Sequence, residues 1–206
     1  MAALNMTHHR LPSLFAVLFV AGALAAPAHA AEAAADPGTQ REFNAKIMVC
    51  ESCHSPGGMS KTATIPVITG QREDYILKQL HDFHSGDRNF EIMKWMSESL
   101  SEAEQGAAAS YFSKKNWPAR TAAAAAAPAP RGVAVCQACH QENFLGAVQA
   151  EGMAAPRLAG QRYEYLVEAM RRFAEGERKN NVTMMQLMAG MSAADREAMA
   201  RYLSGL

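Results

Sequence analysis

The stretch that decides the fold is CESCH at residues 50–54, in which a histidine directly follows the second of two cysteines. The same pattern returns as CQACH at residues 136–140. These two stretches contain all 4 cysteines of the 206-residue chain. Whatever chemistry the pattern serves, the chain is expected to carry it out at two places.

The segments that follow the two cysteine motifs are also copies of each other. Residues 66–88 and 156–178 share Pro, Gly-Gln-Arg, Tyr, Phe, Gly and Arg in the same order, at an offset of 90 positions (156 − 66). An alanine- and proline-rich stretch at residues 116–131 separates the copies and has the composition of a linker. The repeat therefore predicts two tandem domains related by duplication, at residues 31–115 and 132–206.

Residues 1–30 have the pattern of a secretory signal peptide. An apolar run from Leu11 to Ala26 precedes Ala28-His29-Ala30, a cleavage motif, and the run is shorter than the roughly 20 residues of a spanning helix. This predicts export to the periplasm, with an uncleaved leader that holds the protein loosely at the membrane as the alternative. The 20 basic and 20 acidic residues give no charge excess that would favour nucleic-acid binding.

The secondary structure is expected to be helical. Apolar residues recur at i, i+4 and i+7 after each Gly-Gln-Arg, as at Ile76, Leu80 and Phe83. Ser101 and Ser192 each begin an S-x-x-[DE] pattern, which is typical of a capped helix start. No stretch shows the sustained alternation of a strand, so we predict an all-α fold with few or no strands.

The C-x-x-C-H pattern is the sequence form of covalent haem attachment. Two cysteines one short turn apart can form thioether bonds to the two vinyl groups, and the following histidine then lies beneath the iron as a proximal ligand. Three alternatives are a zinc site, a thioredoxin-like redox pair and two plain disulfides. The pairs lie 83 positions apart (136 − 53), far from zinc-ribbon spacing, no βαβ context is visible, and disulfides leave the histidines unexplained. We predict two haem c groups, held by Cys50, Cys53, Cys136 and Cys139 with His54 and His140 on the irons.

The sixth iron ligand is predicted to be methionine in both copies. No histidine follows His140, whereas the second copy is rich in methionine. Met93 and Met184 each stand eight residues before the capping serine of their copy, which assigns them as the axial ligands. Other methionines are near enough to compete; they are Met96, Met185 and Met188, and the choice between Met184 and Met185 stays open.

His81 and His84 are a weaker possibility for iron ligation. Their counterparts in the second copy are Arg171 and Ala174, so a duplicated site does not use them. A place on a helix surface or a contact with a haem propionate is the expectation for both.

Further pairs are expected near the iron sites. A prolyl carbonyl of Pro66 or Pro156 could accept the Nδ1 proton of the proximal histidine. Tyr75, Tyr165, Arg72 and Arg162 could meet a haem propionate or the other domain, and the alternative is that they are ordinary helix-start and interface residues.

Together, the paired motifs, the Gly-Gln-Arg helix start, the Phe-x-x-Gly-x-Arg turn and the spaced methionines resemble the dihaem class I cytochromes c of the cytochrome c4 type. The chain also resembles the cytochrome subunit of flavocytochrome c sulfide dehydrogenase. The resemblance implies two small helical cytochrome c folds about a pseudo-twofold axis, and a periplasmic electron carrier rather than an enzyme. It implies redox partner proteins such as a quinol–cytochrome c reductase, a terminal oxidase or a dehydrogenase. The alternative functions are a cytochrome subunit of a flavocytochrome or other dehydrogenase complex, and a dihaem peroxidase, which the matched methionines disfavour.

Overall fold

A computed structural model describes residues 36–54, 62–118, 127–148 and 154–206. The predicted signal peptide lies outside these ranges, as does most of the alanine run of the predicted linker. Within the described ranges, no helix combines the length and the hydropathy needed to cross a membrane.

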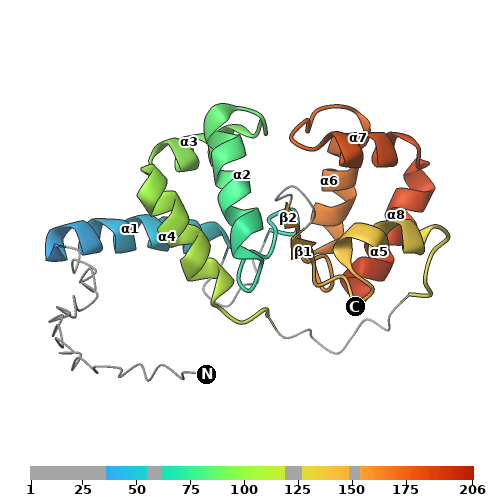
Figure 1. The fold of residues 1–206 in the computed structure, drawn as a ribbon, viewed down its shortest axis with the longest axis horizontal. Helices are drawn as coiled ribbons and strands as arrows, with labels where there is room; N and C mark the ends of the chain where they lie inside the picture. Colours follow the sequence, from blue (N-terminus) through green and yellow to red (C-terminus); the bar gives the residue numbers. More distant parts are fainter. Residues whose placement is uncertain (1–35, 55–61, 119–126, 149–153) are drawn as a thin grey trace, which may run out of the picture. The chain divides into compact units, whose positions relative to one another are not determined.

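The described residues of the first repeat form four helices (Figure 1), α1 (Pro37–His54), α2 (Glu73–Ser85), α3 (Glu91–Glu98) and α4 (Glu102–Ser113). Helix α2 packs against both α3 and α4. The apolar stripe predicted for α2 is largely confirmed, because Ile76 and Phe83 are buried and Leu80 is half-buried. The buried core of this repeat is formed by Ile47, Ile76, Leu100, Ala108, Ala109 and Phe112.

In the part of the second repeat that the structure describes, four helices correspond to these, α5 (Val133–His140), α6 (Tyr163–Ala174), α7 (Val182–Ala189) and α8 (Ala193–Gly205). Here α6 packs against α7 and α8, as α2 packs against α3 and α4. Two antiparallel strands of two residues each, β1 (Ala147–Val148) and β2 (Ala154–Ala155), lie between α5 and α6. The largest buried side chains of its core are Phe144, Leu166, Met170, Phe173, Met188, Met199 and Leu203.

The repeats also agree in how their helices begin. The Ser101 side chain accepts a hydrogen bond from the Glu104 N–H, and the Glu104 side chain accepts from the Ser101 N–H, which completes the predicted capping box. Ser192 caps α8 by accepting from the N–H of Asp195. These caps satisfy N–H groups that a helix start leaves without an internal partner. The all-α fold with two tandem repeats is thus confirmed.

The repeats differ most at their first helix. Helix α1 has 18 residues before and including His54, whereas α5 has only 8 up to His140. Helix α5 starts after Gly132, whose φ of 82° is left-handed, and the prolines at residues 128 and 130 precede it. Because proline and left-handed glycine do not continue a helix, α5 keeps little more than the turns that carry the cysteine motif.

Candidate functional site

The last turn of α1 carries the first cysteine motif. Cys50 and Cys53 lie three residues apart on this helix, which places both thiols on the same side. Cys50 is half-buried and its thiol lies 3.3 Å from the carbonyl of Lys46, while Cys53 is exposed. His54, the last residue of the helix, is 8% exposed. The helix therefore presents two thiols beside a buried imidazole.

The end of α5 repeats this arrangement with the second motif. Cys136 is half-buried, Cys139 is exposed, and His140 is 6% exposed. Burial raises the pKa of both Cys50 and Cys136, so these groups are neutral thiols at neutral pH. None of the 4 cysteines forms a disulfide in the structure, so the two short disulfides considered from the sequence are not observed.

Both histidines are held by a prolyl carbonyl. Nδ1 of His54 lies 2.9 Å from the carbonyl oxygen of Pro66, and Nδ1 of His140 lies 2.9 Å from that of Pro156. This confirms the prediction for the two prolines. Because a carbonyl only accepts hydrogen bonds, each Nδ1 carries the proton and each Nε2 keeps a lone pair that can bind a metal. Burial lowers the pKa of both imidazoles despite these carbonyl contacts, so the rings are neutral, as metal ligation requires.

Met93 and Met184 take the same place in their repeats. Each is the third residue of its helix, α3 or α7, and each is half-buried. The neighbouring methionines of the second repeat differ in their surroundings. Met188 is 3% exposed and belongs to the core, and Met185 stands where the first repeat has the exposed Lys94. The arrangement of the helices thus matches Met93 with Met184 rather than with its competitors.

The surroundings of both motifs fit an apolar macrocycle. Val49 on α1 and Ile92 on α3 are 51% and 58% exposed in the first repeat. In the second, Val135 next to Cys136 is 55% exposed and Val182 at the start of α7 is 65% exposed. Large apolar side chains left open beside the thiols and beside the candidate methionines are what a haem would cover.

His81 and His84 lie near the C-terminal end of α2, and both are exposed. Nδ1 of His84 is 3.3 Å from the carbonyl of Ser97, which joins α2 to the end of α3. Their position on a helix surface agrees with the expectation from the sequence.

A cluster of buried and half-buried polar groups joins the two repeats. The Tyr75 hydroxyl accepts a hydrogen bond from Arg178 at 3.1 Å, and the Tyr165 hydroxyl accepts one from Arg88 at 3.3 Å. Both guanidinium groups also donate to Oε1 of Gln79, each at 2.8 Å. Of the two roles expected for the tyrosines, contact with the other repeat is the one observed. Gln79 was not expected from the sequence, because it has no copy in the second repeat, where Ala169 stands in its place.

The arginines of this cluster change the acidity of a tyrosine. Burial opposes ionisation of the Tyr165 phenol, but the positive charges of Arg88 and Arg178 outweigh it and lower its pKa to about 8. Each guanidinium also stacks on a phenylalanine of its own repeat, Arg88 at 4.5 Å from the Phe83 ring centre and Arg178 at 4.3 Å from that of Phe173. This stacking explains why the Phe-x-x-Gly-x-Arg pattern occurs in both copies.

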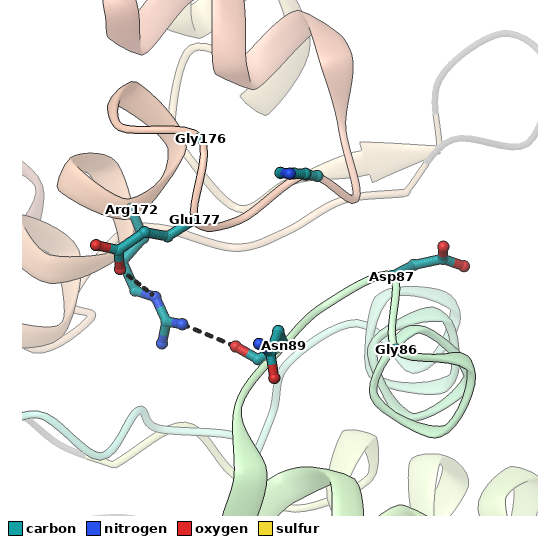
Figure 2. A pocket seen from close by; sticks show the side chains of 7 residues that line it. Gly86, Asp87, Asn89, Arg172, Gly176 and Glu177 are labelled. Carbon is teal, nitrogen blue, oxygen red and sulfur yellow. Dashed lines mark hydrogen bonds and ion pairs between the residues drawn. The ribbon is translucent and has the colours of Figure 1, made fainter.

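A surface pocket of about 510 Å³ lies between the loops that follow α2 and α6 (Figure 2). Two of its charged lining residues, Arg172 and Glu177, pair with each other. Arg172 donates to the carbonyl of Asn89 at 2.7 Å and lies 3.3 Å from the carboxylate of Glu177. The pocket contains none of the predicted haem ligands, and its mixed charge singles out no class of ligand.

Known proteins resemble the chain over both repeats. Residues 124–206 match the cytochrome c protein family. Cytochrome c4 of Azotobacter vinelandii is 31% identical over 87% of this chain and 91% of its own length. The thiosulfate dehydrogenase electron acceptor of Stutzerimonas stutzeri strain A1501 is 31% identical over 82% of this chain and 83% of its own. The solved structure of cytochrome c4 from Acidithiobacillus ferrooxidans superimposes with a TM-score of 0.66 at 30% identity, covering 76% of this chain and 98% of that one.

Proposed function

Because the chain belongs to the cytochrome c4 family of c-type cytochromes, we propose that it is a dihaem electron carrier whose two irons each have one histidine and one methionine ligand. Membership of this family gives two tandem cytochrome c folds and covalently bound haem c, and makes the chain an electron-transfer protein rather than an enzyme. The number of haems and their ligands form the proposal.

The observation that carries the proposal is the duplicated geometry of the proximal side. In each repeat a helix ends on Cys-x-x-Cys-His, and the histidine is buried with its Nδ1 at 2.9 Å from a prolyl carbonyl. Since the two copies agree in motif, burial and hydrogen bond, they support one haem per repeat. Cys50, Cys53, Cys136 and Cys139 would form the thioether bonds, and His54 and His140 would be the proximal ligands.

The haem supplies an iron that gains and loses one electron. The protein's residues then determine how readily it does so. Each prolyl carbonyl fixes the tautomer of its histidine and increases the basicity of Nε2. Met93 and Met184 would close the opposite side, and a thioether opposite histidine raises the reduction potential and leaves no open position for a substrate. The apolar side chains beside both motifs would exclude water from the macrocycle.

Location and partners are part of the same proposal. The leader at residues 1–30 supports export to the periplasm, where redox proteins would exchange electrons with the chain. The balanced charge does not favour one strongly charged partner. Candidate partners are a quinol–cytochrome c reductase, a terminal oxidase and a dehydrogenase. Relatives that serve as electron acceptors of thiosulfate dehydrogenase support the dehydrogenase.

These relatives also favour a second candidate, a cytochrome subunit that acts within a dehydrogenase complex. The two functions share the same haem sites and differ in whether the chain stays bound to its donor. Size-exclusion chromatography of the native periplasmic extract separates them. A free carrier elutes at the mass of one or two chains, and a subunit elutes with a dehydrogenase activity.

The ligand assignment is tested by the spectrum of the oxidised protein and by a haem count. The pyridine haemochrome of the mature protein is expected to give two haems per chain. The intensity of the long-wavelength charge-transfer band of a methionine–iron bond should fall by about half in the single variant Met93→Leu. It should fall by about half in the single variant Met184→Leu as well. Met185→Leu is the matched control and should retain the full band. Loss of the band in Met185→Leu with retention in Met184→Leu would overturn the assignment of the second haem.

A further inference from the structure

Two buried glutamines each reach from one repeat into the other. Gln161 is 3% exposed; its Oε1 accepts the N–H of Val67 at 2.9 Å and its Nε2 donates to the carbonyl of Val67 at 3.0 Å. Gln71 is 4% exposed and makes the same pair of bonds to Arg157, at 2.8 Å and 2.9 Å. Each side-chain amide thus binds both backbone polar groups of one residue in the opposite repeat.

The residue that each glutamine binds is joined directly to the proline that holds a proximal histidine. The carbonyl of Pro66, which accepts from His54, and the N–H of Val67, which donates to Gln161, belong to one peptide group. In the second repeat, the peptide group from Pro156 to Arg157 accepts from His140 and donates to Gln71. A chain of hydrogen bonds therefore runs from each glutamine, through one peptide group, to the histidine of the other repeat.

The orientation of the glutamine amides is fixed by their donors. Oε1 of Gln161 also accepts the N–H of Arg162 at 3.0 Å, and Oε1 of Gln71 accepts that of Arg72 at 2.9 Å. Two N–H groups face each oxygen, so a flipped amide would leave both without an acceptor. Arg72 and Arg162 are the N-cap residues of α2 and α6, so each helix start fixes the glutamine that reaches across.

Hydrogen bonds at the two ends of a peptide group strengthen each other, by about 10–30% per bond. A glutamine oxygen on the N–H side makes the prolyl carbonyl a better acceptor for the histidine Nδ1 proton. The imidazole then donates more electron density through Nε2, which stabilises oxidised iron and lowers the reduction potential. Removal of the glutamine should act in the opposite direction.

We propose that Gln161 is a positioning residue for the haem of the first repeat, and Gln71 for the haem of the second. Each repeat therefore influences the reduction potential of the iron in the other repeat. This inference rests on the proposed function, since it requires His54 and His140 to be the proximal ligands.

The test uses Gln161→Met in the full-length protein with both haems. An NMR-monitored redox titration, with resonances assigned to each repeat, gives the two potentials separately. We expect the reduction equilibrium constant of the first-repeat haem to rise about threefold, which is about 28 mV at 59 mV per tenfold change, with a smaller change at the other haem. Exchange of the Val67 amide hydrogen should also become faster.

Gln71→Met is the matched control, because it removes the same bonds from the other side and should raise the potential of the second-repeat haem instead. Gln161→Glu keeps an oxygen acceptor for Val67 in either protonation state, and it should not raise the potential of the first haem. If Gln161→Met fails to mature, these two variants still carry the test.

Three results would overturn the inference: no change in potential, equal changes at both haems, or a larger change at the haem of the substituted repeat. Failure of the proposed function has a different signature. In that case the unaltered protein itself would lack two haems with histidine N–H signals, before any variant is compared.

Discussion

The most informative substitution outside the ligands is Gly146→Ala, next to the proximal loop of the second repeat. Gly146 has a φ of 81°, and its N–H donates to the carbonyl of His140 at 3.1 Å. A Cβ built on it would lie 2.4 Å from the carbonyl oxygen of Ala155 and 2.6 Å from the carbonyl carbon of Pro156. The latter atom belongs to the carbonyl that holds His140.

The expected loss in the free energy of unfolding has two parts. An alanine in the left-handed region costs about 1–2 kcal/mol. The contact at 2.4 Å must open by about 1 Å to reach ordinary separation, and overpacking of this kind costs about 1–3 kcal/mol more. Gly176→Ala is the matched control, since Gly176 has a φ of 71° but a Cβ there would meet no described atom within 4 Å. We expect a loss of about 2–5 kcal/mol for Gly146→Ala and about 1–2 kcal/mol for the control.

Native-state hydrogen exchange of the α6 and α8 amides measures the free energy of opening of the second repeat in both variants. Because the clash pushes on the Pro156 carbonyl, Gly146→Ala should also shift the potential of the second-repeat haem, whereas Gly176→Ala should not. Equal losses in the two variants, with no change in either potential, would refute the reasoning.

Two further predictions concern ionisation and capping. Since Arg88 and Arg178 together lower the pKa of Tyr165 to about 8, the Tyr165 signal in a carbon-13 NMR titration should move near pH 8, and Arg88→Leu should raise that pKa. Because the pKa of Tyr165 is lower in the folded than in the unfolded chain, its contribution to the free energy of unfolding should grow as the pH rises from about 8 to about 10 and should be absent below pH 8. Titration of Tyr165 only near pH 10 would contradict the electrostatic argument. Ser101→Ala should lower the free energy of opening of α4, measured by amide hydrogen exchange, by about 1 kcal/mol. Ser192→Ala should lower that of α8 by a similar amount. Each loss should stay within its own repeat, and a loss shared by both would contradict a local capping role.

The features that sequence could predict are those set by short-range pattern. The cysteine motifs, the capping serines and the apolar spacing of α2 each depend on a few neighbouring residues, and the duplication allowed each to be checked against its copy. The prolyl carbonyls were also predictable, since a proline occurs at the same place before Gly-Gln-Arg in both copies. The structure shows these elements as expected.

The features that sequence did not predict depend on how distant segments pack. Phe144 lies shortly after the second cysteine motif; it is fully buried, has a φ of 57°, and its carbonyl accepts from the N–H groups of Leu158 and Ala159. No short sequence pattern predicts that such a residue is buried. The short strands β1 and β2 were not located from the sequence for the same reason, because their pairing joins only two residues of each strand. Gln71 and Gln161 were visible only as part of a repeated motif, and their partners lie in the other repeat.

The central claim is that the chain holds two haems, each closed by histidine and methionine, and exchanges one electron at each. A reductive titration of the mature protein under carbon monoxide tests this most directly. The account predicts two electrons taken up per chain, with both reduced haems low-spin and neither binding carbon monoxide. Uptake of one electron, or a haem that binds carbon monoxide, would contradict it.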